Sequence, residues 1–102
     1  MYINMKKVKK WNNNGVLVDK ITKKVKKDCK LLIDDFLYLA HLHKWYWSKR
    51  EINYDSVVSL LVELSIQLLV SDSNCYCTGR LGVYKEEIED TDDIFLDFCI
   101  QY

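Results

Sequence analysis

Proline is absent from this sequence, and glycine, arginine and alanine are scarce, with three, two and one residues. Three isolated glycines cannot form the glycine-rich loop that cradles phosphate groups, which excludes that class of nucleotide-binding motif. No serine stands in the Gly-x-Ser-x-Gly pattern of a nucleophile elbow. The four scarce residue types all use GC-rich codons, so the composition indicates an AT-rich genome, such as that of a low-GC bacterium, its phages and mobile elements, or an AT-rich virus.

Long apolar runs are also lacking. The most apolar stretch, residues 57–70, is interrupted by serine, glutamate and glutamine, and it is too short and too polar to span a bilayer. No apolar N-terminal segment marks a secretory signal, so we expect a cytoplasmic protein whose four cysteines are reduced. The chain has 102 residues, of which 49% are hydrophobic, so residues 1–102 are expected to form a single ordered domain.

The chain carries no net charge, but its charges are sorted by position. Residues 1–30 hold ten lysines against two aspartates, a net charge of about +8. Residues 81–102 hold seven carboxylates against Lys85, a net charge of about −6. We name these segments the basic pole and the acidic pole. They predict either two oppositely charged surfaces or two segments that neutralise each other.

An amphipathic pattern predicts one long helix over residues 20–47, with Asp19 as its cap. Its apolar stripe recurs at steps of three or four residues: Ile21, Val25, Cys29, Leu32, Phe36, Leu39, His43 and Trp47. The lysines of the basic pole crowd the first turns, where like charge and the helix dipole both weaken a helix. We therefore expect this end of the helix to need a neutralising segment or partner.

A second helix is predicted over residues 54–71, with Asn53 or Asp55 as its cap. Apolar side chains cover most of its circumference, which indicates either the central helix of the fold or the interface of a homodimer. Glu63 lies in the middle of this helix and needs an exposed position or a partner.

Strand patterns occur at both ends of the chain. The asparagine-rich turn that ends at Gly15 predicts an N-terminal hairpin of residues 2–10 and 16–19. Further strands are predicted at residues 75–78, 83–88 and 94–100. The predicted fold class is therefore α+β, with two helices packed on antiparallel strands from N- and C-terminal hairpins.

Two cysteines and two histidines raise the question of a zinc site: Cys75, Cys77, His41 and His43. The Cys-x-Cys spacing is shorter than that of usual zinc sites, and histidines two positions apart point about 200° apart on a helix. We therefore predict no metal, no other cofactor and no catalytic site. Whether Cys75 and Cys77 bind a metal by themselves stays an open question at this stage.

We expect a small non-enzymatic interaction protein that binds a host protein or nucleoprotein complex. An acidic surface can dock onto a basic groove, and its candidate residues are Glu86, Glu87, Glu89, Asp90, Asp92 and Asp93. Trp45 and Tyr46 join them, because three consecutive aromatics cannot all face the core and exposed Trp, Tyr and Arg dominate binding hot spots. An inhibitor of a host defence nuclease, such as a CRISPR effector, fits the size, the codon bias and the acidic segment.

The alternative function is nucleic-acid binding through the lysine-rich segment 6–30. Its candidate contacts are Lys23, Lys24, Lys26, Lys27 and Lys30. Lysines neutralise phosphates without reading bases, so such binding should weaken steeply with salt. The segment lacks arginine, which makes most bidentate base contacts, and the chain as a whole is not basic. Nucleic-acid binding therefore ranks second.

Overall fold

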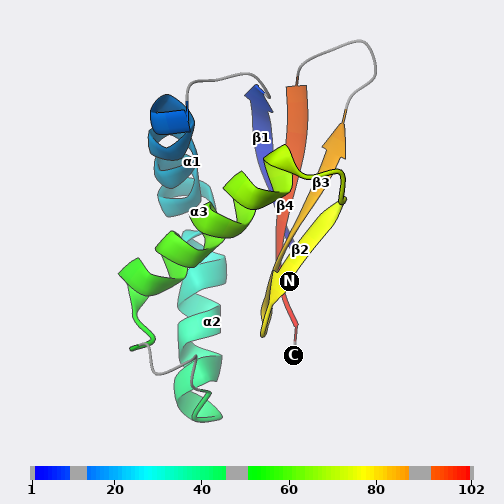
Figure 1. The fold of residues 1–102 in the computed structure, drawn as a ribbon. Helices are drawn as coiled ribbons and strands as arrows, with labels where there is room; N and C mark the ends of the chain where they lie inside the picture. Colours follow the sequence, from blue (N-terminus) through cyan, green and yellow to red (C-terminus); the bar gives the residue numbers. More distant parts are fainter. Residues whose placement is uncertain (1, 10–13, 46–50, 88–92, 102) are drawn as a thin grey trace.

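The computed structural model describes residues 2–9, 14–45, 51–87 and 93–101. Within these residues, three helices lie on one face of a four-stranded antiparallel sheet (Figure 1). The elements are, in chain order, β1 (Tyr2–Lys9), α1 (Asn14–Asp28), α2 (Lys30–Leu42), α3 (Tyr54–Val70), β2 (Cys75–Thr78), β3 (Leu81–Glu87) and β4 (Asp93–Ile100). The predicted α+β class is confirmed.

The strand order is β1-β4-β3-β2, so the first strand of the chain pairs with the last. Phe98 of β4 stands opposite Ile3 on one side and Val83 on the other. The predicted N-terminal hairpin is wrong, because residues 16–19 lie inside α1 and β1 takes its partner from the far end of the chain. A short β-branched run has only a weak preference for strand, which packing of the surrounding helix overrides.

The apolar stripe of the first predicted helix is confirmed through its core, where the following residues are buried: Ile21, Val25, Cys29, Leu32 and Phe36. The single helix itself is wrong, because it starts at Asn14 and is interrupted at Cys29, where α1 passes into α2. Asp19 consequently lies inside α1 and caps nothing. Near the interruption, the Tyr54 hydroxyl of α3 donates a hydrogen bond to the Lys26 carbonyl of α1 (3.1 Å). This bond connects α3 to the end of α1.

A Schellman motif ends α2. Lys44 has a left-handed backbone with φ of 52°, its amide donates to the His41 carbonyl, and the Trp45 amide donates to the Ala40 carbonyl. The helix therefore stops at Leu42 instead of residue 47. The reversal also folds Trp45 back toward the helix, with 6.0 Å between the ring centroids of Trp45 and Phe36.

α3 is the central helix, as its composition predicts. Asn53 caps it through a reciprocal capping box with Ser56, in which the Ser56 amide donates to Asn53 Oδ1 and the Asn53 amide donates to Ser56 Oγ, both at 2.9 Å. It packs against α1, α2, β2 and β3, and Glu63 takes an exposed position. No helix of the described residues has the length and apolarity needed to cross a membrane.

Alternation along β3 and β4 separates two faces of the sheet, and Gly82 and Cys99 of the outer face are buried as well. Leu81, Val83 and Lys85 of β3 point toward the helices and are buried, together with the apolar residues of β4: Ile94, Leu96, Phe98 and Ile100. Gly82 and Tyr84 of β3 therefore belong to the opposite, outer face. The strands predicted in the C-terminal third are confirmed, with β3 beginning at Leu81.

Lys85 joins the sheet to the C-terminus of α3. Its side chain is buried among apolar residues, and Nζ donates hydrogen bonds to the Leu68 carbonyl (2.8 Å) and the Ser71 carbonyl. The last carbonyls of a helix lack intrahelical donors, and they carry the negative end of the helix dipole. An ammonium group at this position donates hydrogen bonds to these carbonyls, and its positive charge is favoured by the dipole. The one cation of the acidic pole is thus a structural residue.

We predict that Lys85→Met lowers the free energy of unfolding by about 1–3 kcal/mol, because the Ser71 carbonyl loses the Lys85 donor and the Leu68 carbonyl keeps only its longer hydrogen bonds from Ser71. Urea unfolding followed by circular dichroism measures the change. Lys23→Met is the matched control, since Lys23 is exposed on α1 and its replacement should change the free energy by less than about 0.5 kcal/mol. Equal urea midpoints for Lys85→Met and the wild type would contradict the role assigned to Lys85.

Candidate functional site

Four lysines form an exposed row on α1 and the start of α2. Lys23, Lys26, Lys27 and Lys30 are exposed, whereas Lys24 is half-buried. Lys26 and Lys27 follow Lys23 at three and four residues, which places these three on one side of α1, and Lys30 follows at the start of α2. We call this row the lysine face. Because α1 begins at Asn14, Lys26 and Lys27 lie in its last turn, where the helix dipole favours cations. The expected strain at a lysine-rich helix start therefore does not arise.

The acidic pole is described only in part. Glu86 and Glu87 are exposed at the end of β3, and Asp93 begins β4. Glu89, Asp90 and Asp92 lie outside the described residues. In Figure 1, the end of β3 and helix α1 are well separated, and α1 packs chiefly against α3 and β1. The exposed lysines and the described glutamates therefore belong to separate surfaces.

Helix α2 carries an apolar stripe on its outer side. Leu31, Tyr38 and Leu42 have exposed fractions of 75%, 65% and 60%. They are spaced by seven and four residues, so they lie in one line, roughly opposite the buried Ile33 and Ala40. We call this stripe the α2 face. The α2 face was not predicted from the sequence. Its three apolar residues form a second line on the same helix, but the longer apolar stripe that is buried dominates the pattern.

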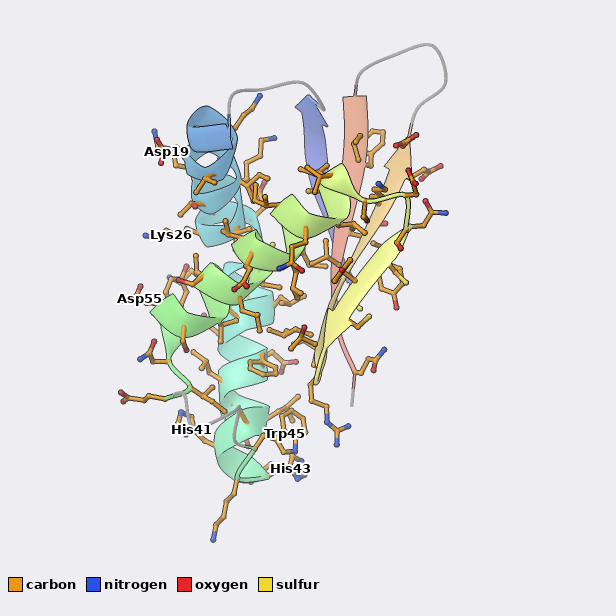
Figure 2. The ribbon with its side chains drawn as sticks, in the orientation of Figure 1. Asp19, Lys26, His41, His43, Trp45 and Asp55 are labelled. Atoms are coloured by element: carbon orange, nitrogen blue, oxygen red, sulfur yellow. The ribbon has the colours of Figure 1, made fainter. Side chains whose placement is uncertain are left out.

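A second cluster forms where the end of α2 meets the turn between β2 and β3. The Arg80 guanidinium lies 4.8 Å from the centroid of the Trp45 ring, and the His43 ring stacks on Trp45 at 5.3 Å and 17°. Figure 2 shows His43 and Trp45 together, with His41 on the other side of the helix end. Trp45 is half-buried, so it contributes both to packing and to the surface. Tyr46 lies outside the described residues.

The four cysteines are free thiols in two kinds of environment. Cys29 is fully buried at the α1–α2 junction, and burial, with a smaller contribution from Asp28, raises its pKa to about 12. Cys99 is also buried, and burial raises its pKa. Cys75 and Cys77 are exposed on β2. No group of three or more His, Cys, Asp or Glu side chains within the described residues is arranged to hold a metal ion.

No protein-family model, no curated protein and no solved structure matches this chain. Function therefore has to be inferred from the surfaces themselves. Three described surfaces are candidates: the lysine face, the α2 face, and the Trp45 cluster with His43 and Arg80.

The thiol environments predict ordered alkylation. At pH 8, Cys75 and Cys77 should react with iodoacetamide first and Cys99 more slowly, because the thiolate is the reactive species. Cys29, with a pKa of about 12, should react only after the protein opens. Mass spectrometry of timed digests measures the order, and denatured protein, in which all four should react, is the control. Early labelling of Cys29 would contradict its burial.

Proposed function

We propose that this chain is a non-enzymatic interaction protein that binds an amphipathic helix of a partner protein through the α2 face. The observation that carries this proposal is the line of Leu31, Tyr38 and Leu42, each at least 60% exposed. Single exposed apolar residues are common and need no explanation. Three in one line on a helix form a surface of the kind that receives the apolar face of another helix.

The dimensions and charge of the α2 face define its partner. Leu31 and Leu42 are eleven residues apart, so the stripe spans roughly 16 Å, or three helical turns. Asp34 is exposed and Asp35 is half-buried, and both lie between Leu31 and Tyr38. The exposed Asp34 carboxylate beside the apolar stripe favours a partner helix that carries a lysine or arginine between its apolar residues.

Self-association through the α2 face is disfavoured by the same carboxylates. In an antiparallel pair of α2 helices centred between Leu31 and Leu42, Asp34 of one copy would stand opposite Leu39 of the other, so its charge would face an apolar residue and no cation. A parallel pair would align each aspartate with its own copy. Like charges in an interface cost free energy, so the α2 face suits a different, basic partner better than a second copy of the chain.

The Trp45 cluster and the exposed Glu86 and Glu87 support the same function. A tryptophan stacked under an arginine is already ordered, so a partner that contacts it pays little side-chain entropy. In the specific form that we propose, the chain is encoded by a phage, a virus or a mobile element, and the partner is a host protein or nucleoprotein. A defence nuclease inhibited by this contact is one such partner.

If the α2 face binds the partner, a charge introduced into this face should weaken partner binding, whereas the same charge elsewhere should not. The chain and its variants would be used to capture proteins from a host lysate, and recovered proteins would be quantified by mass spectrometry. Tyr38→Glu should lower the affinity for the captured protein by about 30-fold or more, the range of a binding hot spot. A photo-crosslinker at Leu42 should map to a basic, amphipathic helix of that protein.

Val70→Glu is the matched control for this experiment. Val70 is 78% exposed but lies at the end of α3, so its replacement adds the same charge to a different surface. The control should retain the captured protein. Capture that survives Tyr38→Glu, or that fails equally with Val70→Glu, would overturn the proposal.

The lysine face favours nucleic-acid binding as a second candidate function. Its four exposed lysines follow one side of α1 and the first turn of α2, and a row of cations suits a phosphate backbone. The half-buried Lys24 is less available for such contact than the sequence suggests.

The second candidate predicts salt-dependent binding to DNA or RNA. Replacing all four lysines of the lysine face by glutamine should reduce the slope of log K against log salt by about 3, at roughly 0.7–0.9 per phosphate contact. Fluorescence anisotropy with a labelled oligonucleotide measures the slope. Tyr38→Glu is the control and should leave the slope unchanged. Absence of binding at low salt would exclude this function.

A further inference from the structure

Two thiols and a glycine form a row across three strands on the outer face of the sheet. Cys77 of β2 stands opposite Gly82 of β3, and Gly82 stands opposite Cys99 of β4. Gly82 alternates with Leu81 and Val83, which point toward the helices, so this row lies on the opposite side. We call Cys77, Gly82 and Cys99 the thiol row.

Both sulfur atoms lean over the glycine. A Cβ built on Gly82 would lie 2.9 Å from Cys77 Sγ and 3.0 Å from Cys99 Sγ, so the two sulfurs are at most 5.9 Å apart. The missing side chain of Gly82 is therefore the space into which the thiols converge. Any larger residue at this position would push them apart.

The two thiols cannot form a disulfide with each other in this fold. Their strands are separated by β3, so the Cα atoms lie two strand spacings apart, or about 9.5 Å. Disulfides need Cα atoms within about 7 Å. The pair can therefore share a bound atom between the sulfurs, but it cannot close a direct bond without a rearrangement of the sheet.

Tyr84 completes the surroundings of the thiol row. Its Cε2 atom lies 3.6 Å from the same point above Gly82, and its hydroxyl group hydrogen-bonds to the side chains of Cys99 and Cys77. Electrostatic interaction with Cys99, and then with Cys77, raises the pKa of Tyr84 to about 12. Cys77 is exposed, which gives access from solvent, whereas Cys99 is buried.

We propose that the thiol row is a binding site for a soft monovalent cation of the copper(I) class, held between Cys77 Sγ and Cys99 Sγ. Thiolates select soft cations. The described residues supply no third His, Cys, Asp or Glu ligand, so the four ligands of a structural zinc site are not available. With metal–sulfur bonds of about 2.3 Å, a linear sulfur–metal–sulfur unit spans about 4.6 Å, within the upper limit set by Gly82.

Binding at this site is a ligand exchange without a redox step. Two S–H bonds break, two sulfur–metal bonds form, and the two protons pass to solvent. The Tyr84 hydroxyl can then donate its hydrogen bond to a metal-bound thiolate, which supports the ligand in the manner of other outer-shell donors. The site is independent of the α2 face, which lies on the helical side of the sheet.

Titration with copper(I) alone, under anaerobic conditions and in competition with a chromophoric copper(I) chelator, tests the site. The wild type should retain one equivalent per chain. Cys77→Ser should weaken binding by at least 100-fold. Cys75→Ser is the matched control, because Cys75 is an exposed thiol on the same strand but stands opposite Tyr84 instead of Gly82. It should leave the affinity unchanged within about twofold.

Gly82→Ala provides a second variant that keeps all four thiols. Its added Cβ enters the space between the sulfurs, so binding should weaken by at least tenfold while circular dichroism still shows the folded protein. Equal losses in Cys75→Ser and Cys77→Ser, or no retained copper in the wild type, would overturn the assignment. Zinc that binds as tightly as copper(I) would also overturn it.

Discussion

The alternation of buried side chains along β3 and β4, together with the hydrogen bonds of the Lys85 ammonium group to the end of α3, sets which side of the sheet faces the helices. Lys85 is a buried cation that follows Leu81 and Val83 on the helical face of β3, and its partners are the Leu68 and Ser71 carbonyls. Because side chains alternate along a strand, this contact also decides which residues of β3 face the helices. A slip of one residue would bury Tyr84 and expose Lys85, and would leave the α3 carbonyls without the Lys85 donor.

The outer face follows from the same constraint. With Lys85 directed inward, Gly82 and Tyr84 must point outward, and the pairing of β3 with its neighbours places Cys77 and Cys99 on either side of Gly82. The thiol row therefore depends on the register that Lys85 stabilises. One contact on the helical side of the sheet thus positions the chemical groups on the other side.

The sequence predicted the features that depend on local periodicity. The buried stripe from Ile21 to Phe36, the Asn53 cap and the alternation in β4 were all recognisable, because each is a repeat within one element. Features that depend on distant pairing were missed or wrong. β1 pairs with the end of the chain, and the thiol row needs three strands in register. The end of α2 was also missed, because Lys44 takes a left-handed conformation that usually signals itself by glycine.

The sorted charges have a different meaning in the folded chain than in the sequence. The basic pole was expected to need a neutralising partner because its lysines seemed to crowd a helix start. In the structure, α1 begins earlier, and Lys26 and Lys27 lie in its last turn, where the dipole favours them. Lys85, the one cation of the acidic pole, is buried. The lysine face on α1 and α2 therefore does not oppose the helix dipole. The two poles meet elsewhere in the fold, because β1 of the basic pole pairs with β4 of the acidic pole and Lys9 stands opposite Asp93. The pairing of β1 with β4 brings part of the opposite charges together in the sheet, whereas the lysine face and the end of β3 stay apart and present their charges to the surface.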